Sequence, residues 1–227
     1  MNQDPLSDVL RSVRLRGAVF FYVSCRDDWV AASPAASDIA EAVLPGAEHM
    51  LGYHLIVKGS SWVASDGISP VRAAGGDIVM FPHGDAHVLS SAPGRQGQPY
   101  DSEWLLDTRD MHKPIPLSYY GGLLQPGAAM PADEASTVVV CGFVGCDLRP
   151  FNPLIEALPR LLHLSAGGIG AWVAPVLHQA VSESRLRRPG SAAVLERLSE
   201  MVFVDAARHY LESLPEDASG WLAALRD

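Results

Sequence analysis

The fold is decided by one stretch of the sequence, Gly76-Asp77-Ile78-Val79-Met80-Phe81-Pro82-His83-Gly84-Asp85-Ala86-His87. Its pattern is G-x5-P-x-G-x2-H. Two adjacent glycines, Gly75 and Gly76, turn the chain into a short apolar strand over residues 78–81. The Pro-x-Gly sequence then predicts a tight turn that delivers His87 onto the next strand, residues 87–89. We therefore expect a β-structure that presents this histidine on a strand.

The sequence around this stretch also favours β-structure. From residue 18 to about residue 145 it reads as short apolar runs separated by Gly, Pro, Asp and Ser. Closely spaced short strands are typical of a sandwich or a barrel, and both protect strand edges that would otherwise aggregate. We expect strands over residues 18–24, 29–32, 53–58, 61–64, 71–73, 77–81, 87–90 and 137–143.

The stretch 76–87 resembles the second sequence motif of the cupin barrel, a fold that holds a ligand or a metal ion. The resemblance implies a chain that is mainly β with α: a cupin-like β-barrel (jelly roll) followed by a C-terminal helical region. We expect the barrel, with a short N-terminal helix, to occupy residues 1–150. Residues 151–227 are expected to be a helical dimerisation or linker region.

Helical signals lie at both ends of the chain. Asp4-Pro5 is an N-cap followed by proline at the first helical position, and Gly17 closes this first helix. Beyond residue 150 we expect helices over residues 152–158, 169–185, 192–211 and 221–225. The helix at 192–211 is apolar over a wide arc, so both sides need cover. The barrel can cover one side and a second copy of the chain the other, which predicts a homodimer through the C-terminal helices.

Residues 93–131 have no clear period. The segment is rich in proline and glycine, and it also carries Met111, Trp104, Tyr119 and Tyr120. Loops of this length within a domain are typically surface excursions, lids or interaction segments. We expect a long loop of one of these kinds.

The composition excludes several classes of protein. The net charge is −9, and only Arg185-Leu186-Arg187-Arg188 is locally basic, so binding of nucleic acid by this chain itself is not expected. The sequence shows no signal peptide and no apolar run of about 18 residues, which predicts a soluble, cytoplasmic protein without membrane contact. Three cysteines without framework spacing indicate reduced thiols.

The usual cupin metal site is not encoded. In a cupin, two histidines in an H-x-H pair and a glutamate come from the first motif, and one histidine comes from the second. Here the first motif ends at Gly59, which places Gly52 at the glutamate position. The histidine positions fall in residues 45–48, which contain no histidine. Only His87, from the second motif, remains of that ligand set.

A different set of side chains could form a site. His54 lies two residues beyond the lost glutamate position, hence on the same face of its strand. With His87 and Cys141 it offers two imidazoles and a thiolate, a set that suits Zn²⁺, with His83 or water as a fourth ligand. The alternative is that these are ordinary core residues, since buried cysteine is common and inert. The residues expected at the barrel mouth, and so to contact a ligand, are His54, Trp62, His83, His87 and Cys141.

No signature of covalent or nucleotide chemistry is found. The sequence has no G-x-S-x-G, no P-loop motif and no G-x-G-x-x-G after a strand. The glycines at 167–170 follow a helix and fit a helix C-cap. We therefore do not expect an enzyme with catalytic residues of these kinds.

Several segments together resemble the cupin-type sensor domain of AraC-family transcriptional regulators. They occur in the right order over nearly the whole chain, at residues 4–10, 14–20, 54–62, 76–89, 141–143, 152–154 and 158–164. The resemblance implies a domain that binds a small-molecule effector, dimerises and passes a signal to a DNA-binding helix-turn-helix module. That module is absent from this chain, so we expect either the sensing part alone or a stand-alone relative.

Two other functions remain open from the sequence. One is a metal-dependent cupin enzyme, an isomerase or dioxygenase, against which the degenerate first motif counts. The other is a purely structural dimer module with a collapsed barrel. Neither the identity of an effector nor the sign of regulation follows from the residues.

Overall fold

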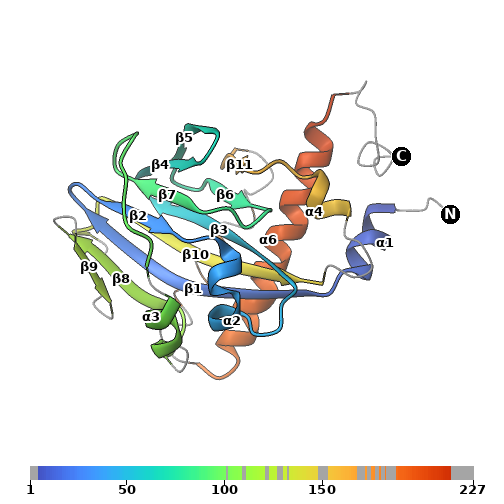
Figure 1. Cartoon of the computed structure of the whole chain (residues 1–227), viewed down its shortest axis with the longest axis horizontal. Coiled ribbons are helices and arrows are strands. Elements are labelled where there is room, and N and C mark those ends of the chain that lie inside the picture. Colours follow the sequence, from blue (N-terminus) through green and yellow to red (C-terminus); the bar gives the residue numbers. More distant parts are fainter. Residues whose placement is uncertain are drawn as a thin grey trace.

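The structure is a computed structural model that forms two β-sheets with helices packed around them (Figure 1). It describes residues 5–100, 102–108, 111–120, 123–126, 130–131, 133–147, 153–167, 172, 175–176, 179, 182 and 188–215. Within these residues, no helix is long and apolar enough to cross a membrane.

The larger sheet has seven strands in the order β11-β6-β3-β10-β1-β8-β9. Neighbouring strands are antiparallel except β1 and β8, which run parallel. The strands are β1 (Leu15–Arg26), β3 (His49–Lys58), β6 (Ile78–Phe81), β8 (Ile115–Tyr120), β9 (Leu123–Pro126), β10 (Thr137–Cys146) and β11 (Leu162–Leu164).

The smaller sheet faces the larger one, and the two form a sandwich. Its order is β2-β7-β4-β5, with strands β2 (Val30–Ser33), β4 (Ser60–Ser65), β5 (Ile68–Ala74) and β7 (His87–Ser90). One hydrophobic core fills the space between the sheets, with Trp29, Val63 and Leu89 from the small-sheet side and Phe81 and Phe143 from the large sheet. The predicted fold class is confirmed: the chain is mainly β with helices, and its cupin-like part is a two-sheet sandwich without a closed barrel.

The motif that decided the fold forms the corner between the sheets. β6 pairs with β3 in the large sheet, whereas β7 pairs with β2 and β4 in the small sheet. The turn between them contains Gly84 at φ 72°, and a side chain there would press on the carbonyl of Met50. The Pro-x-Gly turn therefore moves the chain from one sheet to the other.

The long helix α6 covers the outer face of the large sheet. A second hydrophobic core lies there, with Leu51, Tyr53 and Val144 on the sheet side and Val202 and Phe203 on α6. The helices are α1 (Pro5–Ser12), α2 (Ala36–Val43), α3 (Ser102–Asp107), α4 (Pro153–Ala157) and α6 (Ser191–Ser213), with α6 drawn in red-orange in Figure 1. Both faces of the large sheet are thus buried.

Most of the predicted elements are found, with shifted ends. The N-terminal helix, the eight strands and the helices at 152–158 and 192–211 correspond to α1, β1–β7, β10, α4 and α6. The predicted helix at 221–225, and most of the one at 169–185, lie outside the described residues. The boundary between the two predicted regions stays a prediction, and β11, which follows it, completes one edge of the large sheet.

The prediction of a long loop over 93–131 is wrong. This segment contains α3, β8 and β9, and β8 pairs in parallel with β1 over six residue pairs from Phe21 to Arg26. Its prolines hid the strand, because Pro116 interrupts the apolar alternation while its pairing partner Tyr22 still lies in register. Helix α2 was also missed by the sequence analysis.

Candidate functional site

A small cavity lies in the core between the two sheets. Its volume is about 40 Å³, which leaves room for a few water molecules at most. Its wall is mainly aromatic and aliphatic, and the exceptions are Ser33, His54 and Cys141, together with the hydroxyls of two tyrosines. The lining residues are Phe21, Val23, Trp29, Ala31, Ser33, His54, Leu89, Tyr100, Leu117, Tyr119, Val139, Cys141 and Phe143.

Strand register brings His54 and Cys141 together. The two residues are direct partners in the antiparallel ladder of β3 and β10, so their side chains share one face of the sheet. That face is the inner one, because Val139 and Phe143, two residues to either side of Cys141, also line the cavity. His54 therefore faces the space between the two sheets.

A continuous chain of short contacts links three of the predicted side chains. His54 Nδ1 lies 3.1 Å from Cys141 Sγ, and His54 Nε2 lies 2.6 Å from His87 Nε2. The other nitrogen of His87, Nδ1, lies 2.8 Å from the backbone oxygen of Asp85. The rings of His87 and Phe81 stack, with centroids 3.8 Å apart and an interplanar angle of 9°.

The carbonyl at the end of this chain sets the position of every proton. A carbonyl oxygen only accepts, so His87 Nδ1 carries the proton, and in the neutral ring Nε2 is then an acceptor. His54 Nε2 must donate to that acceptor, which leaves His54 Nδ1 to accept from the thiol of Cys141. All three side chains are neutral in this arrangement.

The burial of the three groups favours the same neutral state. Desolvation lowers the pKa of His54 well below its usual value, and the nearby His87 lowers it further. Burial also lowers the pKa of His87 to about 4, although its contact with the Asp85 backbone opposes this effect. Burial raises the pKa of the Cys141 thiol to about 12.

These pKa values argue against a nucleophilic cysteine. Moving the thiol proton along the chain to His87 would produce a thiolate and an imidazolium inside an apolar core. Burial disfavours both of these charges, because it lowers the pKa of His87 and raises that of Cys141, so the transfer is unfavourable. Reactive cysteines have a lowered pKa, so Cys141 lacks the activation that covalent catalysis needs.

The arrangement does not fit the predicted zinc site as it stands. Two nitrogens bound to one zinc at about 2.0–2.1 Å in a tetrahedron lie roughly 3.3 Å apart, further than the 2.6 Å between His54 and His87. Cys141 contacts the opposite nitrogen of His54, so one ion cannot reach both partners of that ring. Across the described part of the chain, no group of three or more His, Cys, Asp or Glu side chains is placed to hold a metal.

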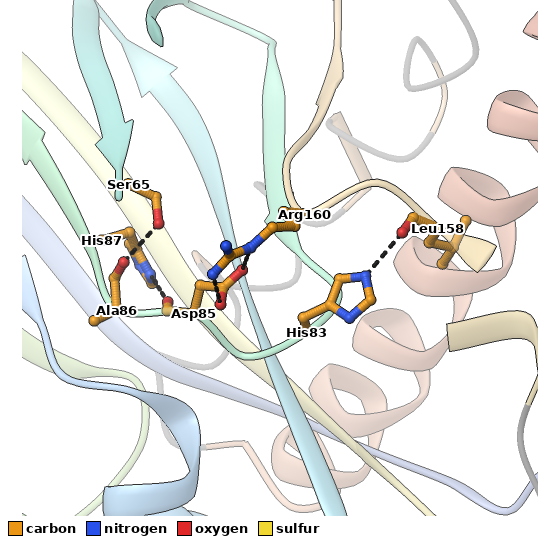
Figure 2. Close-up of polar contacts among 7 residues, drawn as sticks. All are labelled: Ser65, His83, Asp85, Ala86, His87, Leu158 and Arg160. Atoms are coloured by element: carbon orange, nitrogen blue, oxygen red, sulfur yellow. Dashed lines mark hydrogen bonds and ion pairs between the residues drawn. The ribbon is translucent and has the colours of Figure 1, made fainter. Parts of the chain in front are cut away.

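His83, the proposed fourth ligand, lies elsewhere. Figure 2 shows its ring turned toward the segment after α4, where Nε2 lies 2.8 Å from the Leu158 carbonyl and donates to it. In the same turn Asp85 accepts two bonds from the Arg160 guanidinium, at 2.6 and 2.9 Å. These contacts tie the corner that carries His87 to the chain leading into β11.

Trp62 also lies away from the cavity. It alternates along β4 with Val63, which is fully buried in the inter-sheet core, so the two side chains point to opposite faces. Trp62 is only half-buried and is absent from the cavity wall. Of the five predicted contact residues, the structure brings together His54, His87 and Cys141.

An aromatic group from the mispredicted segment closes the cavity. Tyr100 lines it directly and packs edge-on against Phe21, with ring centroids 6.0 Å apart. Trp104 stacks on the same phenylalanine at 5.8 Å and an interplanar angle of 15°. The aromatic content of residues 93–131 was a usable signal, but its place beside the cavity depends on non-local contacts, among them the bridge between Pro99 and Ala32 of β2.

Two regulators are similar to this chain over nearly its whole length. The HTH-type transcriptional regulator AlkR of Acinetobacter baylyi is 25% identical over 230 residues, covering 98% of this chain and 65% of AlkR. An AraC-like transcription regulator of Streptomyces antibioticus is 23% identical over 230 residues, covering 99% of this chain and 65% of the relative. The chain thus spans just under two thirds of the length of each.

Among solved structures, ToxT of Vibrio cholerae gives a weak likeness. Its TM-score is 0.36 at 9% sequence identity, with 87% of this chain and 55% of ToxT covered. At that TM-score the likeness does not establish a shared fold.

The family model described as Cupin (Cupin_6), by contrast, matches residues 4–212. With the motif at 76–87 forming the corner of a two-sheet sandwich, the match shows that this chain belongs to that cupin family.

Proposed function

We propose that this chain is the effector-sensing and dimerisation part of an AraC-type transcriptional regulator. The observation that carries the proposal is the cavity between the sheets, which is lined mainly by aromatic and aliphatic side chains and joined to a buried hydrogen-bond chain. The match to regulators over nearly the whole chain supports it. DNA would be bound by a helix-turn-helix module outside the sequence described here, in the cytoplasm where promoter DNA lies.

The effector, in this proposal, contacts His54 and Cys141 directly. Both side chains are part of the cavity wall, whereas His87 acts through its bond to His54. Pockets for small molecules are mostly apolar with a few placed polar groups, and this wall has that composition. Trp62 and His83 have no place at this cavity and are not part of the proposed contact set.

The signal can leave the cavity along β3. His54 faces the cavity, while its neighbour Tyr53 faces the opposite side of the strand and reaches α6. The Tyr53 hydroxyl lies 2.8 Å from Ser199 Oγ on that helix. A small shift of β3 at His54 therefore moves a residue that is hydrogen-bonded to the helix.

The helix α6 is also the proposed dimer surface. Val194 and Met201 lie seven residues apart on its outer face and are 52% and 42% exposed. Positions spaced by seven form one stripe on a helix, and an exposed apolar stripe favours contact with another apolar surface. A two-fold pairing of α6 helices would cover both residues.

Ligand screening with a cavity-filling variant tests the proposal. Ala31 lines the cavity, so Ala31→Leu fills space that an effector needs. We expect some members of a small-molecule library to raise the Tm of the wild-type protein and to lose this effect in Ala31→Leu. If every stabilising compound acts equally on the variant, the cavity is not the effector site.

A metal-dependent cupin enzyme remains the alternative function. It requires His54 to turn away from Cys141 or from His87, so that one of its ring nitrogens becomes available to a metal ion. The regulator names of the relatives favour a protein that is not an enzyme. Turnover of a small substrate that disappears in both His54→Ala and His87→Ala would favour the enzyme instead.

A further inference from the structure

The wall of the cavity has a definite chemical character. None of its lining residues is Asp, Glu, Lys or Arg. From this wall we propose that the cavity takes a compact, uncharged and mainly apolar molecule, such as a monocyclic alcohol, and rejects carboxylates and ammonium ions of the same shape. This inference rests on the proposed function, which makes the cavity the effector site.

The first argument is the lack of a counter-charge. A charged ligand entering this space would lose its water and gain no opposite charge in the wall, which is strongly unfavourable. The two histidines do not supply a cation on demand. Both are buried, and both ring nitrogens of each are already in contact with Cys141, with the other histidine or with the Asp85 carbonyl.

The second argument is that most polar groups of the wall already have partners, since the Tyr100 hydroxyl is hydrogen-bonded to Ser33 and the imidazole and thiol are bonded to each other. His54 uses Nδ1 for the thiol of Cys141 and Nε2 for His87. The thiol proton is committed to His54, so Cys141 offers a ligand only the lone pairs of its sulfur, which accept weakly. A ligand with a single hydroxyl can use that acceptor, whereas a ligand with many polar atoms would leave most of them unpaired.

The third argument concerns shape. The aromatic rings of Phe21, Trp29, Tyr100, Tyr119 and Phe143 form much of the wall, and flat apolar rings favour an aromatic or cyclic guest. At about 40 Å³ the cavity is too small for such a guest without movement. Tyr100 is tied to β2, because its hydroxyl is hydrogen-bonded to Ser33 and its neighbour Pro99 bridges Ala32. We expect a ligand that enters to break the bond to Ser33 and to displace the Tyr100 ring outward.

Three probes that share one ring test the ligand class. Benzyl alcohol is neutral, benzoate is an anion and benzylamine is a cation at pH 7. Each is titrated into the wild-type protein and followed by thermal unfolding and by calorimetry at constant ionic strength. We expect benzyl alcohol at about ten times its Kd to raise Tm by about 3–6 °C, and the two ions to bind at least a hundredfold more weakly.

Two variants locate the binding. Ala31→Leu places a larger side chain in the cavity and should abolish the shift. The matched control is Ala64→Leu on β4, which lies on the face opposite Val63 and should leave the shift unchanged. Both variants must first show the wild-type circular dichroism spectrum. If Ala31→Leu does not fold, the smaller change Ala31→Val takes its place.

The outcomes separate the inference from the proposed function. If benzoate or benzylamine binds as tightly as the alcohol and is lost in Ala31→Leu, the ligand class is wrong while the cavity remains the effector site. If none of the three probes binds, or if the alcohol binds equally to Ala31→Leu, the inference is overturned. The library screen then decides the proposed function independently, because it includes ligands of other shapes and charges.

Discussion

The packing of α6 on the sheet can be tested through one buried pair, Tyr53 and Ser199. Ser199 Oγ lies 2.9 Å from the Leu195 carbonyl and donates its single proton there. The Tyr53 hydroxyl, 2.8 Å from Ser199 Oγ, must therefore be the donor in their bond. Both side chains are fully buried, at 0% exposure.

This assignment predicts unequal effects of two conservative changes. Tyr53→Phe removes the donor but leaves Ser199 bonded to Leu195, so it should cost only the net value of one hydrogen bond, about 1 kcal/mol. Ser199→Ala leaves the buried phenol without a partner and should cost about 2–3 kcal/mol, partly from the small cavity it creates. The double variant should cost no more than Ser199→Ala alone, because the stranded phenol is gone.

Urea unfolding followed by circular dichroism measures the three free energies of unfolding. For a chain of this length each kcal/mol also moves Tm by about 2–4 °C. The order of the two single variants is the decisive result. If Tyr53→Phe is the more destabilising one, or if the two effects simply add, the proton assignment and the role of this bond in seating α6 are wrong.

Three further predictions follow from the same contacts. Gly17→Ala should destabilise the chain by several kcal/mol and release α6, since the added methyl group collides with the backbone of that helix. At the control position, the methyl group of Gly167→Ala meets nothing within 4 Å, so urea unfolding should show almost no change in stability. Stability should fall between pH 7 and pH 4, because the unfolded chain takes up protons near pH 6.5 that the buried His54 and His87 resist. His87, with a folded pKa of about 4, should account for up to about 3 kcal/mol of this fall, so His87→Phe should make the slope shallower, and an unchanged slope would contradict the neutral state of the ring. Elemental analysis of protein purified without a metal column should give less than one zinc per chain, and equimolar zinc lost in His54→Ala and Cys141→Ala would contradict the hydrogen-bond chain.

Local sequence patterns predicted most of the strands, the strand face on which His54 lies and the turn that leads to His87. The alternation of side chains along a strand placed His54 on the inner face, and the turn at residues 82–86 identified the sheet corner that carries His87. These inferences worked because both depend on neighbours in the sequence. The residues involved lie in strands of four to ten residues whose burial alternation or apolar runs are visible in the sequence.

Non-local features escaped the same reasoning. The parallel pairing of β1 and β8 joins segments about ninety residues apart, and nothing in either segment specifies the other. The position of Tyr100 is likewise set by a non-local contact, because its neighbour Pro99 bridges Ala32 of β2. The zinc hypothesis stays a prediction, and nothing in the sequence indicated that the two nitrogens of His54 contact different partners, which only the ring orientation reveals.

Helix α2 is a different kind of omission, because its signal was present. Residues Ala36, Ile39, Ala42 and Val43 are buried and recur at helical spacing, and Pro34 closely precedes them. The run is short and alanine-rich, and it stands between two strand patterns. Its helical period was therefore outweighed by the β context on both sides.

The central claim is that an effector binds inside the sandwich, against His54 and Cys141. The most direct measurement is a crystal structure of the protein with the library compound that gives the largest thermal shift. The account predicts electron density for that compound within the cavity, in contact with Trp29 and Cys141, with the Tyr100 ring displaced outward. Density for the compound at the surface, with the ring of Tyr100 still closing a cavity that holds only water, would contradict it.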